Sequence, residues 1–142
     1  MILLDTSGLL AAVDADERTH AAASDALVTS RPPRLLSPFV LAELDYLLAT
    51  RVGSTAQIAL LREVARGTYR LEPFDSDDVD RARAIIERYR DLDLGLADAS
   101  IIVLAERHGT TDILTLDERH FRAVRASRGR RFRLLPADLP RR

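Results

Sequence analysis

The chain begins Met1-Ile-Leu-Leu-Asp5-Thr6-Ser7, a short apolar run that ends at an acid. The apolar residues predict a strand, and the Asp-Thr-Ser that follows supplies side chains typical of a helix N-terminus. The segment Ile113-Leu-Thr-Leu-Asp117 has the same order of an apolar run and then an acid. In a parallel sheet, ligands bind in the crevice beyond the carboxyl ends of the strands. Both acids are therefore predicted at the edge where ligands bind.

Between these two segments, short apolar runs alternate with helical patterns. This alternation predicts a single α/β domain over residues 1–142, with a mainly parallel sheet flanked by helices. The predicted strands cover residues 1–4, 34–37, 69–73, 113–116 and 132–135. The predicted helical segments cover residues 8–13, 17–29, 38–51, 54–66, 75–90 and 95–108.

The composition excludes several classes of site. The 142 residues include no Cys, which excludes disulfide scaffolds, thiol nucleophiles and cysteine-bound metals. They include no Lys either, because all 21 basic residues are Arg, and this excludes Schiff-base chemistry and a Walker-type phosphate loop. No apolar run approaches the roughly 18 residues of a membrane span, and the N-terminus lacks a basic signal-peptide region. We therefore expect a cytoplasmic protein with no membrane segment.

Charge is unevenly distributed along the chain. The net charge is −1, yet residues 119–142 carry nine Arg and a single acid. A basic C-terminal segment on an acidic body predicts contact with a polyanion, or with a partner attracted by charge. A solvated tail is the alternative interpretation.

Four acids stand at positions that do not suit an ordinary surface role. Asp5 and Asp117 follow predicted strands. Glu43 and Asp98 have apolar neighbours one turn away on their helices, so we expect their carboxylates to face the core. Buried carboxylates are costly unless they are paired or bind metal. If the four converge, their oxygen atoms favour a hard divalent cation such as Mg²⁺ or Mn²⁺.

Each of these acids also has a purely structural interpretation. Asp5 and Asp117 are possible helix caps. Asp98 lies in a predicted first turn, where the helix dipole favours an acid. An Arg–carboxylate pair is the structural alternative for Glu43 or Asp98.

The segments that carry these acids resemble the motifs of PIN domains. The matching segments are Met1–Ser7, Val40-Leu-Ala-Glu43-Leu, Gly95-Leu-Ala-Asp98-Ala-Ser100 and Leu114-Thr-Leu-Asp117-Glu-Arg-His120-Phe121. Their order, spacing and total length resemble the VapC-type toxins of bacterial type II toxin–antitoxin systems, over essentially the whole chain. The resemblance implies a PIN-like three-layer sandwich with a five-stranded sheet and a central acidic pocket. It also implies a Mg²⁺-dependent endoribonuclease, with Mn²⁺ as a possible substitute, in which metal-activated water hydrolyses RNA phosphodiester bonds.

The same resemblance assigns roles to individual residues. Four acids fall on the catalytic and metal-binding positions of the family: Asp5, Glu43, Asp98 and Asp117. Two hydroxyl side chains fall on positions that support the pocket, Thr6 and Thr115. The charge of the basic segment, rather than the resemblance, makes three of its side chains the predicted contacts for RNA phosphates: Arg119, Arg122 and Arg125.

The family further implies a small cognate antitoxin that blocks the acidic pocket, and a homodimer. Two other hypotheses remain open, a PIN nuclease of RNA processing or decay and a non-catalytic PIN-like binding module. Asp91 and Asp93 precede the Asp98 motif, and we expect them to be exposed rather than to support the site. Neither His20 nor His120 is expected to act as a base, because metal-activated water needs none.

Overall fold

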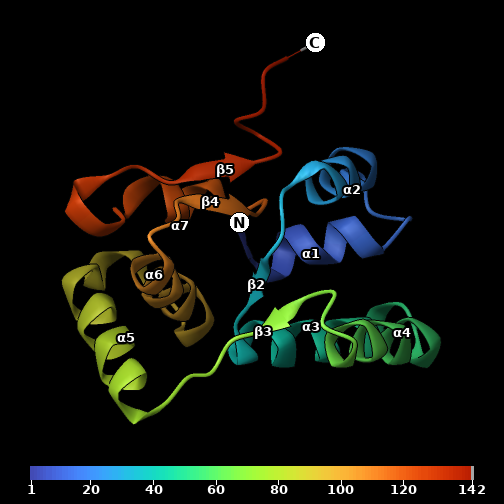
Figure 1. The fold of residues 1–142 in the computed structure, drawn as a ribbon, viewed down its shortest axis with the longest axis horizontal. Coiled ribbons are helices and arrows are strands. Elements are labelled where there is room, and N and C mark those ends of the chain that lie inside the picture. Colours follow the sequence, from blue (N-terminus) through green and yellow to red (C-terminus); the bar gives the residue numbers. More distant parts are fainter. Residues whose placement is uncertain (142) are drawn as a thin grey trace.

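The computed structural model describes residues 1–141, and a parallel sheet lies at its centre (Figure 1). Its strands are β1 (Ile2–Leu4), β2 (Arg34–Leu36), β3 (Arg70–Leu71), β4 (Asp112–Leu114) and β5 (Arg133–Leu135). Within the described residues these five strands pair in the order β3-β2-β1-β4-β5, and every pair is parallel. The predicted α/β fold is confirmed, with a sheet that is entirely rather than mainly parallel.

Helices connect the strands and cover the sheet (Figure 1). They are α1 (Thr6–Val13), α2 (His20–Thr29), α3 (Pro38–Arg51), α4 (Ser54–Ala65), α5 (Ser76–Arg88), α6 (Leu96–His108) and α7 (Glu118–Ala123). The helices pack in neighbouring pairs, α1 with α2, α3 with α4, and α5 with α6. Within residues 1–141, no helix combines the length and the apolar character that crossing a membrane requires.

The centre of the sheet and α6 form the core. Residues 2–4 of β1 and residues 113–114 of β4 are buried, as expected for central strands covered on both faces. Residues 99–105 of α6 are all buried, so the middle of this helix is enclosed on every side rather than packed by one face. The first turn of α6, which carries Asp98, is thereby held against the middle of the sheet.

The start of α1 packs very closely against the end of β4. A Cβ atom on Gly8 would lie 2.3 Å from the Leu114 carbonyl oxygen and 2.7 Å from the Thr115 nitrogen, well inside van der Waals contact. Only a residue without a side chain allows this approach. The approach places Asp5, the N-cap residue of α1, beside Thr115.

Replacing Gly8 by alanine is expected to destabilise the fold by roughly 3 kcal/mol, the upper part of the range for overpacked sites, because backbone opposes the new methyl group. Gly95→Ala is the matched control, since its Cβ would meet nothing nearer than Asp98 Oδ2 at 3.9 Å. Its loss of a favoured N-cap residue should cost about 1 kcal/mol or less. Urea unfolding of both variants measures the difference, and equal losses would contradict the close packing at Gly8.

Candidate metal centre

The predicted acids meet at the carboxyl edge of the sheet. Asp5 directly follows β1, Asp117 is the N-cap residue of α7 beyond β4, and Asp98 lies in the first turn of α6. The charge of Asp98 acts on Asp5, and the charges of Asp117 and Glu43 act on Asp98. Acids from four separate segments of the chain therefore share one electrostatic environment.

Asp5 is the most buried of these acids, with a relative exposure of 5%. Burial raises the pKa of its carboxyl group from 3.8 to about 6, and the charge of Asp98 adds to this rise. Hydroxyl groups of Thr115 and Ser7 oppose the rise by donating hydrogen bonds to Asp5 Oδ2, at 2.6 and 3.0 Å. The Asp5 side chain makes no capping bond to α1, so capping does not explain this acid.

Ser7 and Thr115 connect the two central strand ends. Besides contacting Asp5, Thr115 Oγ1 accepts the backbone N–H of Asp117 at 2.9 Å. Ser7 Oγ accepts the backbone N–H of Leu116 at 3.0 Å. Ser7 was not among the predicted site residues, although it stands beside Asp5 in the opening motif. The hydroxyl pair holds the segment after β1 against the segment after β4.

Glu43 does not face the core, contrary to the expectation from its apolar neighbours. Its side chain is exposed, and the buried face of α3 consists of Val40, Leu44 and Leu48. Glu43 lies beside this stripe and not within it. Its Oε1 accepts a hydrogen bond from Thr6 Oγ1 at 2.8 Å, which holds the carboxylate at the rim of the acid cluster.

Asp98 both supports the start of α6, as its position in the first turn predicts, and belongs to the acid cluster. Its Oδ2 accepts the backbone N–H of Gly95 at 3.2 Å, as an acid in the first turn of a helix can do. Burial raises the pKa of Asp98, and Asp117 and Glu43 raise it further, against the opposing effects of Gly95 and His120. The side chain is only 20% exposed.

His120 belongs to the cluster, which the sequence did not indicate. Its Nδ1 lies 2.7 Å from Asp117 Oδ2 and 3.9 Å from Asp98 Oδ2. Its Nε2 lies 2.9 Å from the Leu92 carbonyl oxygen, which can only accept, so Nε2 carries the proton of that bond. Burial lowers the pKa of His120, but the hydrogen bond and charge of Asp117, with the charge of Asp98, produce a net rise. The helical spacing of Asp117 and His120 is the signal in the sequence that could have revealed this contact.

The donor atoms fit a divalent cation. Asp98, Asp117 and His120 each offer a ligand atom, and these atoms lie within 4.8 Å of one another. Among residues 1–141, no Arg forms an ion pair with Asp5, Asp98 or Asp117. The Arg–carboxylate alternative therefore does not apply to Asp98. The carboxylate oxygens of this set suit a hard cation such as Mg²⁺ or Mn²⁺, whereas an imidazole nitrogen is a more usual ligand of softer transition metals.

Two of the predicted RNA contacts have partners within the protein. Arg122 forms hydrogen bonds of 2.7 Å with both Glu118 and Asp138, and Asp138 also accepts the backbone N–H of Leu134. Arg125 donates through Nη1 to carbonyl oxygens at the end of α7. Arg122 thus ties α7 to the segment after β5.

Arg119 and Arg130, two further arginines of the basic segment, have different surroundings. Arg119 is exposed in the first turn of α7, and no hydrogen bond or ion pair within the described chain engages its guanidinium. Arg130 instead donates to the carbonyl oxygen of Gly109, which lies roughly 16 Å from Asp98 along α6. Asp91 and Asp93 are exposed, as expected.

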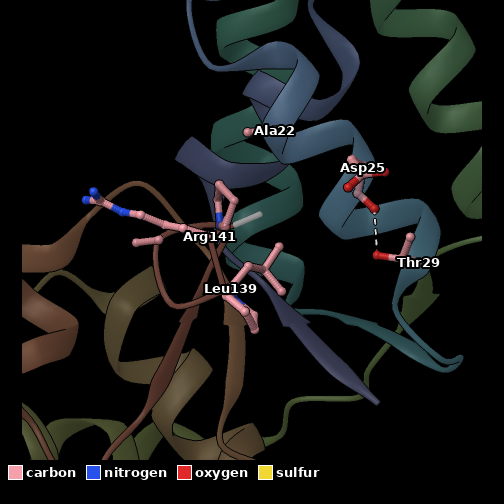
Figure 2. A pocket seen from close by; sticks show the side chains of 8 residues that line it. Ala22, Asp25, Thr29, Leu139 and Arg141 are labelled. Carbon is pink, nitrogen blue, oxygen red and sulfur yellow. Dashed lines mark hydrogen bonds between the residues drawn. The ribbon is translucent and has the colours of Figure 1, made fainter.

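A groove of about 670 Å³ lies away from the acid cluster, between α2 and the C-terminal segment (Figure 2). Figure 2 shows Ala22, Asp25 and Thr29 of α2 on one side of it, facing Leu139 and Arg141. None of the predicted acids lines this groove. Although it is large, this groove is therefore not part of the candidate metal centre.

Comparisons with known proteins identify the family of this chain. Residues 2–126 match the PIN domain family. The chain is 47% identical over 135 residues to Ribonuclease VapC26 of Mycobacterium tuberculosis strain H37Rv, a match that covers 95% of this chain and all of that protein. The crystal structure of Mycobacterium tuberculosis VapC20, a Sarcin-Ricin loop cleaving toxin, matches with a TM-score of 0.77 and 24% identity, over 82% of this chain and 90% of that one. DNA-bound VapBC from Salmonella typhimurium matches with a TM-score of 0.64 and 20% identity, over 94% and 96% of the two chains.

Asp5→Asn is expected to stabilise the metal-free protein at neutral pH. Because folding raises the pKa of Asp5 from 3.8 to about 6, the unfolded chain loses this proton first, and stability falls as pH rises through that window. The free energy of unfolding decreases by about 3 kcal/mol across this pH range. Asparagine removes the charge and keeps an oxygen that can accept from Thr115.

Urea unfolding in EDTA at pH 4 and at pH 7.5 measures this effect. The variant should exceed the wild type in stability at pH 7.5 and approach it at pH 4. Asp91→Asn, at an exposed acid outside the cluster, should show no such difference. A less stable Asp5→Asn variant at pH 7.5 would contradict the burial of an uncompensated charge.

Proposed function

Because the chain belongs to the PIN domain family and is of the VapC type, we propose that it is a metal-dependent endoribonuclease and the toxin of a type II toxin–antitoxin pair. The observation that carries the proposal is the convergence of Asp5, Asp98 and Asp117 without an Arg partner among residues 1–141. The ribonuclease name of a relative that is 47% identical over nearly the whole chain supports RNA as the substrate.

Three carboxylates form the proposed binding site for the cation. Asp5 and Asp98 would bind it directly, and Glu43 would lie at the rim. Asp117 and His120 would lie beside the ion, because their ligand atoms are within 4.8 Å of that of Asp98. Mg²⁺ is the proposed ion, with Mn²⁺ as a substitute, because oxygen atoms dominate the donor set. When bound, the ion lowers the pKa of water and offsets the negative charge that develops on the phosphate.

Side chains around the acids hold them in position. Thr115 and Ser7 fix Asp5 through its Oδ2, and the Gly95 N–H fixes Asp98. His120 orients Asp117, because the Leu92 carbonyl holds the far side of its ring. These contacts arrange the carboxylates before metal or RNA arrives, which lowers the cost of assembling the site.

The partners follow from the same family membership. We propose that a small antitoxin occupies the acidic site and inhibits cleavage, and that the toxin forms a homodimer in the cytoplasm. A short reading frame immediately upstream of the gene, and co-purification of its product with this chain, would support the toxin role. A PIN nuclease of RNA processing would lack such a neighbour.

The purified chain is expected to cleave RNA only with a divalent cation. Total RNA incubated with Mg²⁺ or Mn²⁺ should yield discrete fragments, and EDTA should abolish them. Asp98→Asn should reduce cleavage at least about a hundredfold, because it removes one of the two proposed direct ligands. Mapping the fragment ends would identify the RNA and the cleaved sequence.

The control for this experiment is Asp93→Asn, at an exposed acid five residues from Asp98. It should cleave RNA like the wild type. Folded, metal-loaded protein that leaves all RNA intact would contradict the nuclease proposal and favour a PIN-like binding module. Cleavage that survives both EDTA and Asp98→Asn would exclude the proposed metal centre as its source.

Arg119 and Arg122 are expected to differ in RNA binding. Arg119 is exposed and available to a phosphate, whereas Arg122 is engaged by Glu118 and Asp138. Arg119→Gln should therefore reduce the salt dependence of RNA affinity by about 0.7 in the log–log slope, the value for one phosphate contact on a single strand. Arg122→Gln should leave that slope unchanged and lower the melting temperature.

Fluorescence anisotropy of a labelled RNA in EDTA, at several salt concentrations, measures both slopes without cleavage. Circular dichroism gives the melting temperatures. Equal changes of slope in the two variants would contradict the assignment of Arg122 to the fold.

A further inference from the structure

A small cavity shares a wall with the acid cluster. It has a volume of about 310 Å³, at the lower end of the range for small-molecule sites, and lies between the first turn of α7 and the segment after β5. Thr115, which donates to Asp5, borders it, and Leu116 and Glu118 flank Asp117 along the chain. The residues that line the cavity are Thr19, Thr115, Leu116, Glu118, Pro136 and Ala137.

The lining of this cavity combines apolar surface with polar groups. Leu116 is an apolar side chain with an exposure of 37%, and its neighbours in the chain are Thr115 and Asp117 of the acid cluster. Pro136 and Ala137 supply apolar surface from the segment after β5. The Glu118 carboxylate and the Thr19 hydroxyl add hydrogen-bonding groups. A flat ring with apolar faces and polar edges has the complementary chemistry, and carboxylates accept hydrogen bonds from base amino groups.

Hydrogen bonds within the protein hold both walls of the cavity. Arg122 binds Glu118 on one wall and Asp138, the neighbour of Ala137, on the other. The backbone of Leu116 is held by its N–H bond to Ser7 Oγ. A cavity with fixed walls needs little ordering when a ligand enters, so modest contacts can yield measurable binding.

We propose that this cavity binds the base of the nucleotide whose phosphate lies at the acid cluster. The inference rests on the proposed function, because an RNA substrate would bring a phosphate and its base to the site together. Continuity with the acids through Thr115 selects this occupant. The larger groove in Figure 2 shares Pro136 and Ala137 with this cavity, but neither Thr115 nor any acid of the cluster lines it.

Methyl NMR spectra of the labelled full chain test the proposal. The probes are the four nucleoside 5′-monophosphates in Mg²⁺, with inorganic phosphate as the reference for binding at the acids alone. At least one nucleotide should shift the methyl resonances of Leu116 and Ala137 saturably, whereas phosphate should not. Leu116→Ala should reduce the affinity for that nucleotide roughly tenfold, as expected when buried methyl groups are removed.

Val28→Ala is the matched control, because Val28 is an exposed apolar residue on α2 outside the cavity, with an exposure of 72%. It should leave nucleotide affinity unchanged. Leu116 and Ala137 methyl groups that respond to no nucleotide, or a Leu116→Ala variant that binds like the wild type, would overturn the proposal.

RNA cleavage separates this proposal from the proposed function. With RNA as substrate, Leu116→Ala should raise KM several-fold at nearly unchanged kcat. If RNA is cleaved with metal but the methyl resonances of Leu116 and Ala137 respond to no nucleotide, the base-binding role of the cavity is overturned and the nuclease proposal stands. Nucleotide binding in the cavity without any RNA cleavage would support the cavity and contradict the nuclease.

Discussion

The hydrogen bond from Thr115 to Asp5 joins the two halves of the site, across 110 positions of the chain. It forms because α1 approaches the end of β4 as closely as Gly8 allows. The same approach buries Asp5 and raises the pKa of its carboxyl group to about 6. The packing that assembles the site therefore also makes it costly to keep that site ionised without a cation.

Two opposing effects act on this buried acid, and their balance explains the chemistry of the site. Donated hydrogen bonds from Thr115 and Ser7 favour the charged form of Asp5, but desolvation is the larger effect. A nearby Arg would relieve the cost, yet among residues 1–141 none pairs with Asp5 or Asp98. Such a site lowers the stability of the metal-free fold and raises the affinity for a cation.

The six-residue helix α7 carries much of the site and depends on distant contacts. Six residues are too few for an isolated helix to be stable in water, so α7 needs tertiary support. Phe121 supplies it on the core side, with its ring 6.3 Å from that of Phe132 in an edge-to-face arrangement. Arg122 supplies it on the outer side through Asp138, and His120 reaches Leu92. These contacts place Asp117 and one wall of the cavity together.

Local pattern predicted the five strands, the helical segments up to residue 108 and the positions of the acids in the chain, but it did not predict α7. Apolar runs bounded by turns marked the five strands, and the helix over residues 38–51 was predicted with its observed bounds. Acids that follow strands must lie at the carboxyl edge of a parallel sheet. Only the tertiary structure decided that Glu43 is exposed, that His120 contacts Asp117 and Leu92, and that Arg122 pairs with Asp138. Periodicity is a property of neighbouring residues, whereas burial and charge compensation depend on which distant segments pack against them.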